Sequence, residues 1–246
     1  MLVALLVFFW KLNLDFSVIF DKLPALLGLH LTAQGGLQGA AMTLFLCAVS
    51  MSIAVVMGFV VALGRMSNNA VLFAVATFYA SFFRGTPFLL QVLLIYLGLP
   101  QFGFVPAAVP AGILALSLNY GAYFSEVIRA GISAVPRSQR ESALSLGLSP
   151  AQVFWLVVLP QSMPIIVPPA TSLFISSLKD SSLVAVMGIW EIMFLAQSYG
   201  RSLFRYMEML TAAAIIYWIM SLVLEVLQIA IEKRVAASNT HQPRRP

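Results

Sequence analysis

The feature that most constrains this chain is an apolar run at residues 40–63 that contains no charged side chain. A run of this length matches the ~20 apolar residues that an α-helix needs to cross the hydrocarbon core of a bilayer. Lipid offers no hydrogen-bond partners, so the backbone of such a segment must satisfy itself as a helix. The whole chain is 61% hydrophobic and 9% charged, with a mean hydropathy of +0.94, whereas average proteins carry about 25% charged residues. The sequence therefore predicts an all-α membrane protein.

Four more apolar runs follow, so the sequence predicts about five transmembrane helices in one polytopic domain. The further spans are expected at residues 71–99, 110–128, 165–187 and 209–231. Gly85-Thr86-Pro87 interrupts the second span beside Arg84, because glycine and proline both weaken helices. Residues 1–35 mix charges with aromatics after a short apolar start. We expect them to form a periplasmic or interfacial segment rather than a cleaved leader or a span.

Lysine and arginine are distributed unequally between the two ends of the predicted spans. Eight fall on one side of the membrane: Arg65, Arg129, Arg137, Arg140, Lys233, Arg234, Arg244 and Arg245. Four fall on the other: Lys11, Lys22, Arg201 and Arg205. Cytoplasmic loops carry the excess of basic residues, so we expect the N-terminus outside the cell and the C-terminus in the cytoplasm. The same rule accounts for the formal net charge of +5 without a nucleic-acid partner.

Two polar stretches are therefore predicted to lie in the cytoplasm. One is the tail at residues 233–246, which either touches anionic lipid or is simply solvated. The other is residues 137–160, hereafter called the bent segment.

Local sequence rules predict two short helices in the bent segment. Ser138 and Glu141 have the spacing of a capping box, which would start a helix at that point. Gly147 suits the left-handed position that ends a helix. Ser149 and Gln152 form a second capping box, with a proline between them at the first helical position. Pro160 and Pro164 are expected to mark the approach to the next membrane helix.

The second half of the bent segment carries an apolar patch of Phe154, Trp155 and Leu156. Exposed apolar patches of this kind mark protein interaction sites, so the bent segment is a candidate docking surface. An amphipathic helix lying on the lipid interface explains the same residues equally well, because tryptophan is stable there. The residue pattern alone leaves both interpretations open.

The sequence offers no machinery for chemistry of its own. It lacks the G-x-x-x-x-G-K-[ST] loop that cradles nucleotide phosphates. The single cysteine, Cys47, excludes an intrachain disulfide and a multi-cysteine metal site. His30 and His241 are the only histidines and lie far apart in the chain. We therefore predict neither a catalytic site nor a metal site, and no cofactor bound by this chain.

The bent segment resembles a known motif. Its pattern Glu141-Ser142-Ala143, then Gly147, then Val157-Val158-Leu159-Pro160, is similar to the EAA motif of permease subunits of bacterial ABC importers, which has alanine where this chain has Ser142. Three further blocks, at residues 81–103, 119–139 and 177–192, look like the polar amino acid permease subfamily. The resemblance covers residues 15–231, nearly the whole chain.

The resemblance implies a type I importer transmembrane fold, with residues 36–232 as the permease domain, in the bacterial inner membrane. It also implies a second permease subunit, identical or different, and two cytoplasmic ATPase subunits that bind ATP and Mg. A periplasmic or lipoprotein binding protein would deliver a polar amino acid. The blocks IYLGLPQFG and IIYWIM look most like the cystine-transporting branch of the subfamily. In such a permease the coupling helix would contact the ATPase through Glu141, Ser142, Ala143, Gly147, Leu159 and Pro160.

Charged residues within and between the spans are further candidates. Arg84 either lines a cavity near a substrate carboxylate or holds the broken helix together. Lys179 and Asp180 are neighbours on one helix and cannot simply pair with each other. Each therefore needs another partner, at a buried junction or along the translocation path. Four residues near the predicted outer mouth either receive the binding protein or form a solvated loop: Glu191, Arg201, Arg205 and Glu208.

Two other functions compete with an importer permease. An ion-gradient-driven secondary carrier or channel would need no ATPase, although inverted-repeat carriers usually have more than five spans. An intramembrane enzyme would need paired histidine or carboxylate groups inside the spans, and the sequence does not supply them.

Overall fold

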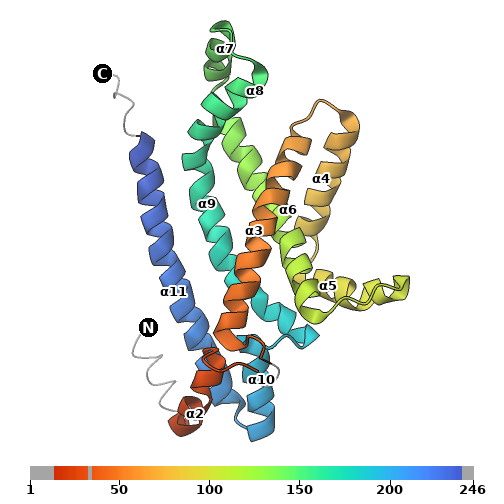
Figure 1. Cartoon of the computed structure of the whole chain (residues 1–246), viewed down its shortest axis with the longest axis vertical. Coiled ribbons are helices and arrows are strands. Elements are labelled where there is room, and N and C mark those ends of the chain that lie inside the picture. Colours follow the sequence, from red (N-terminus) through yellow and green to blue (C-terminus); the bar gives the residue numbers. More distant parts are fainter. Residues whose placement is uncertain (1–13, 33–34, 240–246) are drawn as a thin grey trace. The chain divides into compact units, whose positions relative to one another are not determined.

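The computed structural model describes residues 14–32 and 35–239, and in that part of the chain it is built from helices (Figure 1). The α-helices are α2 (Phe16–Leu26), α3 (Gly39–Arg65), α4 (Ala70–Gly85), α5 (Phe88–Leu93), α6 (Ala108–Ala134), α7 (Arg137–Ser145), α8 (Pro150–Gln152), α9 (Leu159–Asp180), α10 (Ile192–Leu203) and α11 (Tyr206–Asn239). Tighter or wider turns extend them at Leu94–Gly98, Leu99–Phe102, Val153–Val158 and Ser181–Met187.

Three helices are long and apolar enough to cross a membrane, and a bent pair makes a fourth candidate. The three are Gly39–Arg65, Pro150–Met187 and Tyr206–Val235, and the pair Ala70–Gly85 and Phe88–Phe102 meets at 109°. The expected interruption of the second span is thus present. The predicted third span corresponds to α6, which has 27 residues but whose apolar run is diluted by serine, asparagine and charged residues, so it is not among these candidates.

The helix that follows the bent segment starts earlier than predicted. We expected Pro160 and Pro164 to precede a span at 165–187, but helical structure continues without a break from Pro150 to Met187. A π-type turn at Val153–Val158 lies just before Pro160, and the Leu159 N–H bonds to the Phe154 carbonyl. Such turns absorb local irregularity inside α-helices, which explains how the helix passes through Pro160.

The chain divides into two compact units. The first unit comprises the described residues up to Val49, Val92–Ile113 and Leu178–Leu222. Its core packs α2 against α10 (Figure 1) around Leu26, Ile192 and Leu195. The Lys22 ammonium lies 5.6 Å from the Tyr199 ring centroid. The interfacial role expected for residues 1–35 stays a prediction, and residues 1–13 fall outside the described part.

The second unit comprises Ser50–Gln91, Leu114–Ser177 and the described residues from Val223 onward. Small residues let its helices approach closely, as is usual in membrane bundles. A Cβ added at Gly58 would stand 2.4 Å from the Phe124 Cβ, and one added at Gly131 would stand 2.3 Å from Ile166. These two glycines therefore fix how α3 and α9 segments pack on α6.

Candidate functional site

The bent segment forms two short helices joined by a turn, as predicted (Figure 1). Gly147 has φ +83, the left-handed conformation expected after the first helix. Ser149 and Gln152 form the predicted capping box at the start of α8. The first capping box is wrong, because α7 begins at Arg137 after Pro136 and its N-cap makes no side-chain hydrogen bond. Ser138 therefore lies inside the helix, where it does not act as the cap.

The EAA-like residues lie on two faces of the bent segment. Glu141, Ser142 and Gly147 are exposed, whereas Ala143 is only 5% exposed and packs inward. At the end of the segment Leu159 is half-buried and Pro160 is exposed. The motif thus has one anchoring residue and an outward polar face. Such a face is available to a partner, although docking itself stays a prediction.

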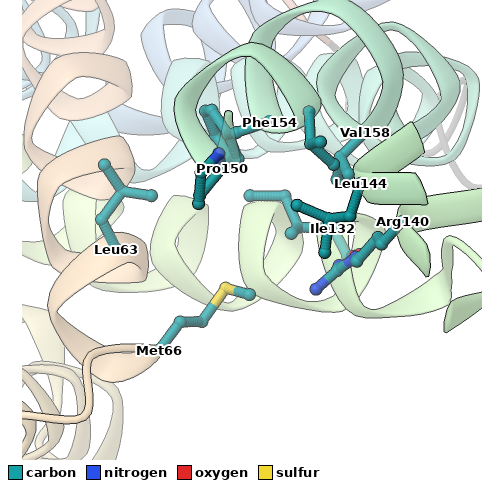
Figure 2. A pocket seen from close by; sticks show the side chains of 9 residues that line it. Leu63, Met66, Ile132, Arg140, Leu144, Pro150, Phe154 and Val158 are labelled. Atoms are coloured by element: carbon teal, nitrogen blue, oxygen red, sulfur yellow. The ribbon is translucent and has the colours of Figure 1, made fainter. Parts of the chain in front are cut away.

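A pocket of about 360 Å³ lies beneath the bent segment (Figure 2). Its walls are the side chains of Leu63, Met66, Ile132, Arg140, Leu144, Pro150, Val153, Phe154 and Val158. Arg140 donates to the Ile132 carbonyl at 2.7 Å, and Phe59 contacts Phe154 and Trp155 with ring centroids 6.3 and 6.1 Å apart. These contacts tie the bent segment to the ends of α3 and α6. Sequence reasoning did not predict the pocket.

A charge cluster in the second unit centres on Glu126. Its Oε2 accepts from Nη1 of Arg65 and from Nη1 of Arg84, each at 2.8 Å, and its Oε1 accepts from Arg129. Arg84 was predicted as a buried charge within a span, but it occupies the last turn of α4 with 39% of its side chain exposed. Arg84 is less buried than predicted because it lies at the end of α4, where its side chain reaches Glu126.

The broken helix is held by a buried amide. Gln91 is 2% exposed, and its Nε2 donates to the Phe83 carbonyl at 2.8 Å and to the carbonyl and hydroxyl of Thr86 at 3.1 and 2.9 Å. Asn119 donates to the Gln91 Oε1 at 2.9 Å. These bonds satisfy carbonyls that the bend frees from the helix. A glutamine four residues after the Gly-Thr-Pro break was the sequence signal that the prediction missed.

Lys179 and Asp180 occupy the last turn of α9. Lys179 is exposed and Asp180 is half-buried in the single chain, so the two do not form a buried junction between its own helices, and a junction between subunits stays a prediction. The helix ends directly after them and turns into the tighter Ser181–Met187 helix, which puts the lysine on the surface of the chain. Their role in a translocation path stays a prediction.

Of the four residues expected at the outer mouth, the two glutamates are buried and the two arginines are exposed. Glu191 is fully buried, caps α10 by accepting from the Phe194 N–H at 2.7 Å, and accepts from the Tyr217 hydroxyl at 2.5 Å. Burial raises the pKa of the Glu191 carboxyl to about 7. Glu208 is 6% exposed and pairs with Arg205 at 3.2 Å. The burial of both carboxylates contradicts the expectation that they contact a binding protein. Arg201 and Arg205 are exposed.

No group of three or more metal-ligating side chains occurs among the residues that the structure describes.

Comparisons with known proteins give a consistent result. A family model described as a binding-protein-dependent transport system inner membrane component matches residues 54–237. An arginine transport system permease protein of Bacillus subtilis is 35% identical over 229 residues, covering 93% of this chain and 100% of that protein. An L-cystine transport system permease protein of the same species is 36% identical over 198 residues, covering 80% and 85%.

One solved structure is similar over almost its whole length. It is a crystal structure of an amino acid ABC transporter with histidines, with a TM-score of 0.80 and 37% sequence identity. The match covers 90% of this chain and 99% of that chain.

Proposed function

Because this chain belongs to the family of binding-protein-dependent transport system inner membrane components, we propose that it is the permease subunit of an ATP-driven amino-acid importer. The family match confirms the resemblance predicted from the EAA-like motif. The structural similarity over 90% of the chain confirms the predicted all-α importer fold in a multi-pass membrane protein. An independent carrier, a channel and an intramembrane enzyme are disfavoured by the same findings.

The observation that carries the proposal is the bent segment. It combines an outward polar face containing Glu141 with an inward anchor at Ala143, which is the arrangement that a docking surface needs. One of two cytoplasmic ATPase subunits would bind this face, and the two ATPase subunits would hold ATP with Mg. This chain would pair with a second permease subunit, identical or different.

Force would pass from the ATPases into the membrane along a continuous helix. The second half of the bent segment, from α8 onward, is continuous with α9 in the helix Pro150–Met187, so a displacement of α8 would be transmitted directly to α9. Closure of the ATPases around ATP would swing this helix, open the path outward and admit substrate. Hydrolysis would reverse the motion, as in other alternating-access transporters.

The substrate class rests on the named functions of the relatives, which carry arginine and L-cystine. We propose a polar amino acid, of which cystine is one candidate. A periplasmic or lipoprotein binding protein would deliver it, with Arg201 and Arg205 as exposed contact residues. The N-terminus would then lie outside and the C-terminal tail in the cytoplasm.

Reconstitution in liposomes tests the proposal. The permease with its ATPase, its binding protein and ATP should accumulate a labelled amino acid, while the permease alone should carry nothing. An ion gradient imposed without ATP is the control for a secondary carrier. Robust amino-acid flux through the permease alone, or flux driven by the gradient, would contradict the proposed function.

A further inference from the structure

The charge cluster around Glu126 is electrically unbalanced. Arg65, Arg84 and Arg129 all form their salt bridges with this one carboxylate. Three positive charges against one negative charge leave a formal surplus of two. The surplus gives the cluster a positive electrostatic potential, which favours a further negative group beside the arginines.

The hydrogen-bond count gives the same indication. Each guanidinium carries five N–H donors, and a carboxylate has only two oxygens to accept them. The Nε of Arg129 is buried and has no partner. Glu126 therefore draws the three arginines together without using all of their donors.

The cluster is also open to a ligand. The side chains of Arg84 and Arg129 are 39% and 36% exposed, while Arg65 is 15% exposed. The Arg84 guanidinium lies 5.9 Å from the centroid of the Tyr123 ring, and Tyr123 is itself 37% exposed. Planar guanidinium forks match the oxygens of carboxylates and phosphates in pairs.

We propose that Arg65, Arg84 and Arg129 form an oxyanion-binding site in which Glu126 is the built-in part. Two ligands carry the required chemistry: the phosphate of an anionic lipid, and the carboxylate of the transported amino acid. The lipid source suits the predicted cytoplasmic side of Arg65, since basic pockets between membrane helices bind lipid headgroups there. The amino-acid source rests on the proposed function, whereas the lipid source does not.

The pair formed by Arg205 and Glu208 provides a matched comparison within the chain. Its arginine has a 48% exposed side chain, like Arg84, but it faces one carboxylate at 3.2 Å, so its charges balance. Arg205→Gln therefore removes a comparable guanidinium without touching the unbalanced cluster.

The test measures ligand affinity of the purified full-length chain from ligand-induced shifts in thermal unfolding in detergent at low salt. Phosphatidylglycerol is compared with phosphatidylcholine, and a free amino acid with its carboxamide. The ligand that fills the site should bind about tenfold or more weakly to Arg84→Gln, because hydrogen bonds to charged groups contribute at that scale. Glu126→Gln should bind it more tightly, and Arg205→Gln should match the unmodified chain.

The outcomes separate the sources. A preference for phosphatidylglycerol that Arg84→Gln loses assigns the lipid, and a preference for the free carboxylate that Arg84→Gln loses assigns the amino acid. Equal affinities of all four proteins for every probe would overturn the site, and so would weaker binding in Glu126→Gln. Uptake with the ATPase is measured separately, so a lipid site can stand even if the proposed transport function fails.

Discussion

Glu191 should make the stability of this protein fall as pH rises, and replacing it with glutamine should remove that dependence. Burial in the first unit raises the pKa of its carboxyl from 4.5 to about 7. A carboxyl with a raised pKa holds its proton in the folded state at pH values where the unfolded chain has released it. Folding is therefore favoured most below pH 4.5 and progressively less until about pH 7.

The size of the effect follows from the shift. Raising the Glu191 pKa from 4.5 to about 7 lowers the free energy of unfolding by about 3 kcal/mol between the acidic and the alkaline end of this pH range. For a chain of this length that amounts to roughly 6–12 °C in the unfolding temperature. Glutamine keeps an oxygen that accepts from the Phe194 N–H but does not ionise. Glu191→Gln should accordingly match the unmodified protein near pH 5 and exceed it near pH 8.

Thermal unfolding of the purified protein across pH 4.5–8 checks this, with the difference between the two curves as the readout. Glu141→Gln, which changes an exposed carboxylate in the bent segment outside the membrane spans, is the matched control and should leave the slope unchanged. Two parallel curves for Glu191→Gln and the unmodified protein would refute the reasoning, because they would show that Glu191 does not take up the proton.

Three other predictions concern the remaining parts of the chain. Glu141→Lys should leave the protein folded but separate ATP hydrolysis from uptake in reconstituted vesicles. Gln139→Lys, at an exposed position about 200° around the same helix, should transport normally. Normal uptake by Glu141→Lys would contradict docking through α7. Gly131→Ala should lower the free energy of unfolding by about 1–3 kcal/mol through overpacking, whereas Gly85→Ala, which meets nothing within 4 Å, should be tolerated; equal melting curves would show that the close approach is not rigid. Gln91→Ala should cost about 1–3 kcal/mol, because it removes the donor to the Thr86 carbonyl and the acceptor of the buried Asn119 amide. An unaltered denaturant midpoint would show that the bend does not depend on the Gln91 amide.

The parts of the structure that depend on local sequence could be predicted. Apolar runs placed α3 and α11, and the Gly-Thr-Pro break placed the bend in the second span. Gly147 and the Ser149 capping box were correct because each acts within a few residues of its own backbone. Pro160 was misread because proline predicts a helix end, while the preceding π turn and the surrounding helices override that preference.

The parts that depend on distant residues could not be predicted. Arg65 and Arg84 lie 61 and 42 positions from Glu126 in the sequence, so no spacing rule connects them. Glu191 looked like a surface charge, but packing against Tyr217 from another helix buries it. The sequence thus identifies which charged residues need a partner, whereas only the three-dimensional structure identifies that partner.

The π turn at Val153–Val158 lies where α8 passes into α9. A turn of this kind contains one residue more than an ordinary turn, and each residue of an α-helix advances by about 100° around its axis. If this turn tightened to the ordinary form, every side chain of α9 would rotate by that angle relative to α8. A small push on the bent segment would then change which side chains of α9 face the pathway, with no bending of the helix.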